Sequence, residues 1–416
     1  MRAIPQRQPL FLGGSIGGVP SFDLNFARGD NAVTKYGFVF TRATSATYVN
    51  STGLIATAAS GELRYTYDPV TLSALGVLIE EQRTNLVNRS EELNNGAFWN
   101  PVRTTPTPSA TTGPNGVANS SCSILETAVT NTFHLDFSFT PAATTTYACS
   151  VFFKGGLGRG YATMDVTGGG GATGSCTINL TTGAVTAGSG TVQSYPNGWW
   201  RVSFTTTTVT TATLAMRLWC SNDGTTSPSY AGDITKGIYA WGAQIEVGAF
   251  VTSYIPSISA SATRNADVLS LTGAADVVAS WFNKDAGTWL VERYGSPAAI
   301  ASAVCVDDGA ATNRILVRQD ASRVPHFIVG STADVTGSAV VAGSAFKTAA
   351  AYAANDVSVS IGGGAVSTDA TVTLPAGMTT ARIGSSSAGE YANAPISRIR
   401  YYPRRLPNAT LKSLTA

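Results

Sequence analysis

Apolar and polar residues alternate with a period of two along most of this chain, a pattern that predicts short β-strands with one buried face. The runs that show it are 147–154, 199–205, 213–220 and 239–245 in the middle of the chain, and 288–292, 314–318, 326–329, 357–361 and 396–401 toward its end. Clusters of Gly, Asn, Asp and Ser separate the runs, and the segment 50–53 is one such turn. The pattern therefore predicts an all-β chain.

The grouping of these runs, together with a length of 416 residues, predicts three regions rather than one domain. Residues 1–88 are expected to form an N-terminal arm and a small β module, and the stretch 1–20 is too rich in Pro and Gly for a packed element. An arm docked on a neighbouring subunit and a frayed terminus both agree with that stretch. Residues 89–262 and 263–416 are each expected to form an antiparallel β-sandwich, the second ending in a short helix at 406–411.

The composition favours strands over helices and excludes several classes of function. Charged residues make up only 12% of the chain and 43 residues are glycine, which disfavours long exposed helices. A net charge of +2 gives no basic field, so nucleic acid is not expected as a partner. The sequence starts without a sustained apolar stretch and has no apolar window of membrane-spanning length, so neither a signal peptide nor membrane insertion is expected.

The five cysteines, at positions 122, 149, 176, 220 and 305, are far apart and show no zinc-like or redox spacing. Several fall in apolar alternating runs, where a free cysteine behaves as a small core residue. They predict a protein that folds with reduced thiols in a cytoplasm.

Three regions of the sequence resemble known families. Two segments strongly resemble the N-terminal module of bacteriophage tail-fibre and head-spike proteins. They are FTRATSATYVNSTGLIATA (40–58) and GVLIEEQRTNLVNRSEEL (76–93). The carbohydrate-binding-module-like jelly roll that follows it in such proteins is similar to YPNGWWRVSF (195–204) and GIYAWGAQIEVGAFVTSYIP (237–256). Concanavalin-like, laminin-G-type sandwiches are similar to the region from GTWLVERYG at 287 through RIGSSSAGEYANAPISRIRYYPRRL at 406.

These resemblances imply a structural virion protein of a tailed bacteriophage, a fibre or spike that assembles in the host cytoplasm and is displayed on the virion surface. The implied partners are other virion proteins and host-surface polysaccharide, and the implied assembly is a homo-oligomer, with a trimer expected. A purely architectural head-decoration or tail-collar protein is the alternative. A polysaccharide-degrading enzyme is a distant third, because these folds serve binding, catalysis and scaffolding alike.

The sequence offers little for catalysis. Its two histidines, His134 and His326, fall in different regions, and Asp136 is close to the first of them. The concanavalin-like β-glucanases place two catalytic acids on one strand as Glu-x-Asp-x-x-Glu, a pattern that the last region lacks. Neighbours such as Glu91 and Glu92 are expected to point apart on a strand or to be solvated on a helix. The chain is therefore expected not to be an enzyme.

The alternation in the middle region predicts one candidate binding surface. With the apolar residues of both strands facing the core, Trp199 and Arg201 face outward on one strand. Arg217 and Trp219 do so on the next strand. If the two strands form a hairpin, these side chains share one sheet face, with Tyr195 at the nearby turn. Indoles stack on sugar rings and arginine donates to sugar oxygens, so this face predicts glycan binding, and burial under a neighbouring subunit or domain is the alternative.

No cofactor is expected, and a structural Ca²⁺ is the one metal ion that the sequence leaves open. Its candidate ligands are aspartates in loops, namely Asp223, Asp233, Asp307, Asp308 and Asp320. Oxygen-rich turns of this kind are also common without a metal, so both readings stay open.

Overall fold

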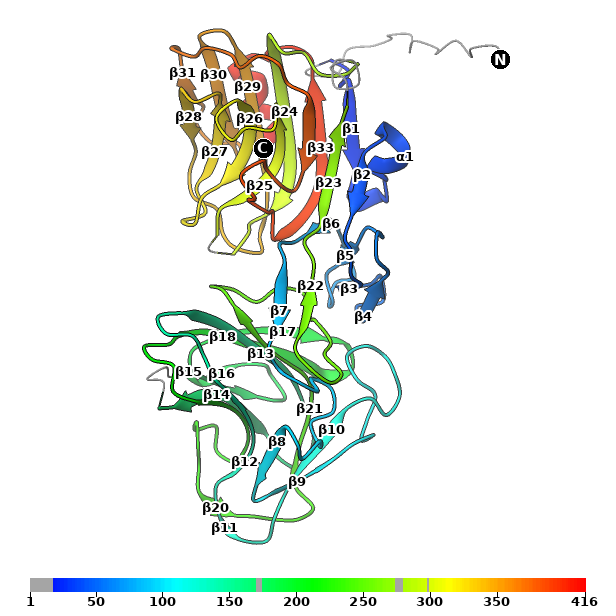
Figure 1. Cartoon of the computed structure of the whole chain (residues 1–416), viewed down its shortest axis with the longest axis vertical. Helices are drawn as coiled ribbons and strands as arrows, with labels where there is room; N and C mark the ends of the chain where they lie inside the picture. Colours follow the sequence, from blue (N-terminus) through cyan, green and yellow to red (C-terminus); the bar gives the residue numbers. More distant parts are fainter. Residues whose placement is uncertain (1–17, 170–173, 274–279, 298) are drawn as a thin grey trace, which may run out of the picture. The chain divides into compact units, whose positions relative to one another are not determined.

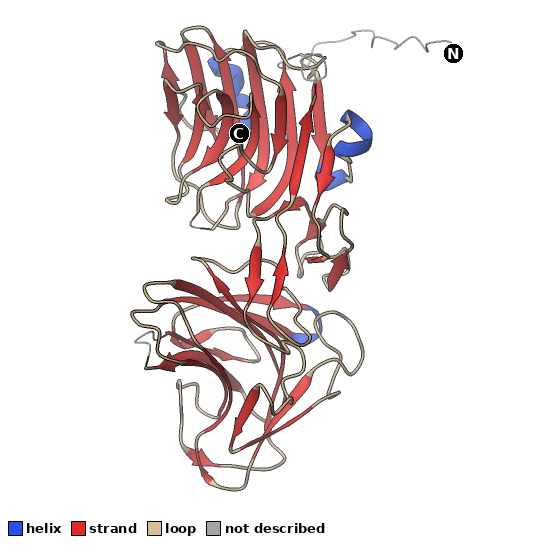
Figure 2. Ribbon diagram, viewed as in Figure 1, coloured by secondary structure: helices blue, strands red, loops and turns tan. Residues whose placement is uncertain are grey.

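The computed structural model describes residues 18–169, 174–273, 280–297 and 299–416. Its regular structure is almost entirely β-strand in antiparallel sheets (Figures 1 and 2), so the predicted all-β fold is confirmed. The chain divides into two compact units, one of residues 40–268 and one of residues 1–39 together with 269–416. All but the last three positions of the predicted N-terminal arm lie outside the described residues.

The unit of residues 40–268 contains a sandwich of two antiparallel sheets. One sheet has the strand order β17 (Thr191–Tyr195), β18 (Trp199–Thr207), β13 (Thr146–Leu157), β21 (Gly237–Val247), β10 (Cys122–Glu126) and β9 (Thr104–Thr107). The other has the order β16 (Val185–Gly188), β15 (Gly174–Asn179), β14 (Tyr161–Gly168), β19 (Leu214–Ser221), β12 (Phe133–Phe139) and β8 (Trp99–Val102). A separate short pair joins β11 (Thr130–Asn131) and β20 (Tyr230–Ala231).

The core of this sandwich is made by the alternating apolar residues of both sheets. Val202 and Phe204 of β18 are buried in one cluster with Leu214 of β19. Trp200 packs against the same cluster, and its indole N–H donates to the Leu180 carbonyl at 3.0 Å. Because roughly 25 cal/mol is gained for each Å² of apolar surface removed from water, this shared face holds the two sheets together.

Residues 40–88 pack against the sandwich within the same unit. Their strands are β3 (Ala46–Val49), β4 (Ile55–Ala58), β5 (Tyr65–Tyr67), β6 (Ala74–Ile79) and β7 (Arg83–Asn85). Strands β3 and β4 form a hairpin across the predicted turn, where Gly53 has a φ of 79° that favours glycine. Strand β7 pairs with β22 (Ala262–Arg264), which follows the sandwich in sequence. The segments before and after the sandwich are therefore joined to each other.

A buried ion network, formed by Arg42, Arg64, Glu80, Arg264 and Asp267, strengthens that connection. Arg64 donates to Glu80 at 2.7 Å and also pairs with Asp267. Arg42 pairs with Asp267 at 2.8 Å, and Arg264 lies 3.1 Å from Glu80. Burial opposes ionisation of Glu80, but the charges of Arg264 and Arg64 outweigh it and lower the pKa of Glu80 to about 2. The charges in this network are therefore compensated within the fold.

The second unit is also a sandwich. One sheet has the order β31 (Ser367–Asp369), β30 (Asp356–Ile361), β29 (Ala345–Ala353), β24 (Ala286–Tyr294) and β33 (Ala394–Tyr402). The other has the order β23 (Val268–Thr272), β32 (Thr380–Ile383), β25 (Ala301–Asp307), β26 (Arg314–Gln319), β27 (Pro325–Val329) and β28 (Ala333–Thr336). Strand β2 (Val39–Thr41) lies at the boundary between the units.

Helices are few and short. The second unit has η1 (Phe26–Arg28), α1 (Ala32–Tyr36) and α3 (Asn408–Thr415), and the first has η2 (Pro196–Gly198). The predicted C-terminal helix is α3, although it occupies 408–415 rather than 406–411. Among the described residues, none of the helices has the length and apolar character that crossing a bilayer requires.

The units divide the chain differently from the predicted boundary at residue 88. Strand β1 (Phe22–Asn25) pairs with β33, with Leu24 opposite Ile399. Asp23 forms an ion pair with Arg398 at 2.7 Å. These N-terminal residues therefore belong with the C-terminal sandwich, whereas the rest of the predicted module belongs with the middle one. A strand of four residues whose partner lies at the far end of the sequence leaves no local sign of that pairing.

Candidate functional site

The two strands that the sequence predicts as a binding hairpin lie in different sheets of the sandwich. Strand β18 pairs with β13 and β17, whereas β19 pairs with β12 and β14. The predicted proximity of Trp199 and Trp219 on one sheet face is therefore wrong. The chain crosses from one sheet to the other between β18 and β19, and the alternation within each strand is the same whether it does so or forms a hairpin.

Trp199 faces away from the sandwich core, as predicted, but it is not exposed. Its side chain is 0% exposed and packs with Ile55, Trp241 and Tyr254. Its indole N–H donates to the Thr112 carbonyl at 3.0 Å. Ile55 belongs to the segment that precedes the sandwich, so another part of the same chain covers the outward face at this point.

Tyr195 and Arg201, from the same part of the predicted surface, line a cavity of about 190 Å³. The turn η2 leads from Tyr195, the last residue of β17, into β18. In the register of β17 and β18, Tyr195 lies opposite Trp199. Arg201 donates to the Ser150 hydroxyl at 3.0 Å, and its guanidinium lies 5.5 Å from the Phe152 ring centroid. Tyr195 and Arg201 thus line a cavity, together with strands β3 to β6, whose position over β18 the alternation does not predict.

Trp219 and Arg217 lie on the outward face of the other sheet. The Trp219 side chain is only 4% exposed, because the His134 ring packs on it at 4.0 Å and the Arg217 guanidinium at 4.7 Å. Arg217 pairs with Asp165 at 2.6 Å, and a ring nitrogen of His134 lies 2.5 Å from Asp136. The indole therefore lacks the open face that stacking on a sugar ring needs.

The candidate calcium ligands lie in different turns, except that Asp307 and Asp308 are neighbours in one turn. All five accept hydrogen bonds from backbone N–H groups of their own turns, namely Asp223, Asp233, Asp307, Asp308 and Asp320. Asp307 is buried and pairs with Arg382 at 2.9 Å. Within the described ranges, no three His, Cys, Asp or Glu side chains are grouped in a way that could hold a metal ion. The structure does not bring the candidate ligands together.

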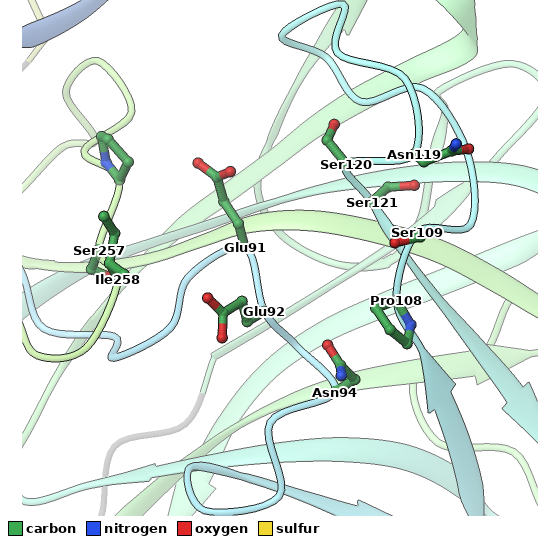
Figure 3. Close-up of a pocket in the computed structure, with 11 residues that line it drawn as sticks. Glu91, Glu92, Asn94, Pro108, Ser109, Asn119, Ser120, Ser121, Ser257 and Ile258 are labelled. Carbon is green, nitrogen blue, oxygen red and sulfur yellow. The ribbon is translucent and has the colours of Figure 1, made fainter.

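A larger pocket, of about 390 Å³, lies on the middle sandwich and was not identified by the sequence analysis. We call it the Glu91 pocket. Glu91 projects between the segment of Ser257 and Ile258 on one side and the loop that carries Ser109 and Asn119 on the other (Figure 3). Glu91 was expected on a strand or a solvated helical turn, but it lies in a bend that borders a pocket.

The backbone around the Glu91 pocket adopts unusual conformations. Ser109 and Asn119, which line it, have positive φ values of 58° and 57°, and the nearby Arg89 has a φ of 56°. Side chains other than glycine rarely adopt this region, which costs on the order of 1 kcal/mol per residue. Such conformations persist where the surrounding structure holds them and are concentrated at binding sites.

Glu91 is a partly buried acid that no basic side chain pairs with among the described residues. Burial raises the pKa of Glu91 above its ordinary value of 4.5, the hydrogen bond with the Tyr254 hydroxyl at 3.1 Å partly offsets this, and the charge of Glu92 adds to the rise. The Tyr254 hydroxyl is itself 2.6 Å from the Ser90 hydroxyl. In the part of the chain that the structure describes, no Lys or Arg forms an ion pair with Glu91.

Glu92, which follows Glu91 directly, also lines the pocket but is exposed. It points away from Glu91 (Figure 3) and pairs with Arg89 at 2.7 Å. Glycoside cleavage needs two carboxyl groups that face the same bond, one of them held protonated.

The remaining lining groups suit a ligand with many hydroxyl groups. Asn94, Ser109 and Asn119 make no side-chain hydrogen bond within the described residues, so their amide and hydroxyl groups are available to a ligand. Glu91 supplies acceptor oxygens among these donors. Ile258, which is 74% exposed, adds an apolar rim. A few convergent polar groups beside apolar surface are what small-molecule pockets typically present.

No protein family and no curated protein matches the sequence. Partial structural likenesses include the CBM40 carbohydrate-binding module of the Ruminococcus gnavus IT-sialidase bound to α2,6-sialyllactose, at 16% identity and a TM-score of 0.30 over 34% of this chain and 89% of that one. Mouse laminin α1 domains LG4-5 match at 10% identity and a TM-score of 0.23, over 65% of this chain and 84% of that one. Trypanosoma rangeli sialidase matches at 9% identity and a TM-score of 0.29, over 75% of this chain and 52% of that one. At these scores, the chemistry of the site rests on its own residues.

Proposed function

We propose that this chain is a structural protein of a tailed-bacteriophage particle, a fibre or spike that binds host-surface glycan through the Glu91 pocket. The resemblance of the segments 40–58 and 76–93 to phage fibre and spike modules supports the virion role. The observation that carries the binding role is the partly buried, uncompensated carboxylate of Glu91 beside side chains that have hydrogen-bonding capacity to spare.

A sugar unit has the hydrogen-bonding groups and the apolar face that match the side chains lining this pocket. Its hydroxyl groups donate to the Glu91 carboxylate and accept from the amides of Asn94 and Asn119. Its C–H face packs on the apolar rim at Ile258. A volume of about 390 Å³ lies near the lower end of the roughly 300–1,000 Å³ range of ligand pockets, so it fits one or two sugar units of a longer chain.

The proposal treats the protein as non-enzymatic and as a homo-oligomer, with a trimer expected, on the virion surface. A purely architectural head-decoration or tail-collar protein is the competing function. A polysaccharide-degrading enzyme requires a second acid opposite Glu91, and Glu92 is directed away from it. Cell binding separates attachment from architecture, and release of soluble sugar separates binding from cleavage.

The test compares the wild-type protein with Glu91→Gln for binding to host cells and to a glycan array. Glu91→Gln keeps the size of the side chain and the acceptor for Tyr254 but removes the charge. We expect affinity for the recognised glycan to fall at least about tenfold, since hydrogen bonds to a charged group are worth about 1.5–3 kcal/mol. Asp285→Asn, which removes an exposed carboxylate elsewhere, is the matched control and is expected to bind like wild type.

Three results contradict the proposal. The first is a failure of the intact wild-type protein to bind any host glycan, which favours the architectural role. The second is unchanged binding by Glu91→Gln, which places the glycan elsewhere. The third is steady release of reducing sugar from host polysaccharide by the wild-type protein, which favours an enzyme. Labelling of virions with an antibody against this chain checks its place on the particle.

A further inference from the structure

The cavity that Tyr195 and Arg201 line, the Arg201 cavity, is distinct from the Glu91 pocket. It is enclosed by the outward face of β18, by strands β3 to β6 and by the residues around Tyr254. Tyr48, Tyr195 and Tyr254 give it aromatic walls, and Thr66 adds a polar side chain. A volume of about 190 Å³ is smaller than the roughly 300 Å³ at which drug-sized pockets begin, so the cavity suits a single ring.

The charge in the Arg201 cavity is unbalanced. Two charged side chains line it, and one of them, Glu80, is already paired with Arg64 and Arg264 in the ion network. Arg201 forms no ion pair within the described residues. Its Nε–H group is buried and has no hydrogen-bond partner there. A partly buried guanidinium with a free donor favours an anion, because a planar N–H fork matches carboxylate geometry.

The surroundings of Arg201 strengthen its preference for an anion. The guanidinium is held by the Ser150 hydroxyl at 3.0 Å and by the Phe152 ring at 5.5 Å, so it is positioned before any ligand arrives. Burial raises the pKa of Tyr195, and the charge of Arg201 and a hydrogen bond with its guanidinium oppose this rise. Positioned charges in such surroundings attract an opposite charge more strongly than the same charges in bulk solvent.

We infer that the Arg201 cavity binds the carboxylate of an acidic sugar unit. Arg201, which has no ion pair among the described residues, pairs with the carboxylate through its guanidinium, and the tyrosine rings pack on the C–H faces of the sugar ring. The inference goes beyond the proposed function, because it concerns a second cavity and assigns a charge to the sugar. Host polysaccharides that carry both neutral and acidic units would then engage two separate sites on one sandwich.

The test measures binding of methyl β-D-glucuronide and methyl β-D-glucoside to the full chain by calorimetry or ligand-observed NMR. The wild-type protein is expected to bind the glucuronide at least about tenfold more tightly than the glucoside, as one charge-assisted contact predicts. Arg201→Gln is expected to abolish that preference, and Arg201→Lys, which keeps the charge without the planar fork, to lose most of it. Arg28→Gln removes an exposed arginine elsewhere and is expected to keep the wild-type preference.

The outcomes separate this inference from the proposed function. Glu91→Gln is expected to keep the glucuronide preference even if it loses host-glycan binding, because Glu91 does not line this cavity. If Arg201→Gln does not fold, as judged by circular dichroism, Arg201→Lys decides. The inference is overturned if wild type shows no glucuronide preference, if either Arg201 variant keeps it in full, or if inorganic sulfate binds as tightly as the glucuronide.

Discussion

Glu80 and Glu91 lie close together in the sequence and in the same unit, Glu80 buried and Glu91 partly buried, but their electrostatic environments are opposite. Arg64 and Arg264 surround Glu80 and lower its pKa to about 2. Glu91 has only hydroxyl partners, and burial raises its pKa above 4.5. A compensated charge of the first kind serves the fold, whereas an uncompensated one costs stability and therefore points to a ligand.

The largest expected effect comes from breaking the ion network. Arg64→Met removes the side chain that pairs with both Glu80 and Asp267 and leaves two buried carboxylates short of a partner. We expect a loss of about 3–5 kcal/mol in the free energy of unfolding, measured by urea titration with tryptophan fluorescence. Lys284→Met breaks the exposed pair with Asp285 and is expected to leave the urea midpoint unchanged. An equal effect of the two substitutions contradicts the structural role of the network.

The next effect is on the stability of the fold at acidic pH. The pKa of Glu80 is about 2 in the folded chain against an ordinary value of 4.5, so its ionised form stabilises the fold above pH 4.5. That contribution, on the order of 3 kcal/mol, is lost progressively as the pH falls from 4.5 toward 2. The stability gap between wild type and Glu80→Gln, measured by urea midpoints at several pH values, is expected to close over this window. A gap that stays constant contradicts the pairing of Glu80.

Glu91→Gln is expected to have a smaller effect of the opposite sign. Because burial opposes ionisation of Glu91, a neutral side chain of the same size is expected to raise the free energy of unfolding at neutral pH by up to about 1 kcal/mol. Thermal unfolding of the two proteins at pH 7 measures the difference. A large destabilisation instead would mean that Glu91 is part of the structural framework rather than a site.

The smallest expected effect is in the reactivity of the buried cysteine thiols. Burial raises the pKa of Cys122 and of Cys149 to about 12 each, for the same reason that it raises the pKa of Glu91. We expect a thiol-specific chromogenic reagent to leave all five cysteines of the native protein unmodified at pH 8 and to titrate five thiols after denaturation. Fast labelling of the native protein contradicts this burial.

The strands could be predicted from the sequence because alternation is local, and Val202 and Phe204 fill the core as their spacing indicates. The hairpin of β3 and β4 across the predicted turn is confirmed, but the pairing of strands that are farther apart in the sequence was not predicted. Strand β1 pairs with β33 at the far end of the chain, and Ile55 covers Trp199 although the two residues are far apart in the sequence. Strands β18 and β19, which are neighbours in the sequence, lie in different sheets. Such contacts depend on the global packing of the sheets, which a period of two does not encode.

The candidate site was only partly predictable for the same reason. Tyr195 and Arg201 were found because residues that alternate with a core face must face outward. Glu91 was read as solvated, since its pocket is assembled from three segments of the chain and no one of them carries a motif. The positive φ values at Ser109 and Asn119 leave no sequence signal, because these residues are also common in ordinary turns.

The central claim is that the uncompensated acid, and not the paired one, contacts the ligand, and the pH dependence of glycan binding tests it most directly. The affinity of wild type for the host glycan it recognises is measured from pH 7 down to pH 4, with Glu91→Gln alongside. We predict that wild-type affinity starts to fall at a pH above 4.5, as the Glu91 carboxylate becomes protonated, and that the weaker binding by Glu91→Gln stays flat. Parallel pH profiles for the two proteins would contradict the claim.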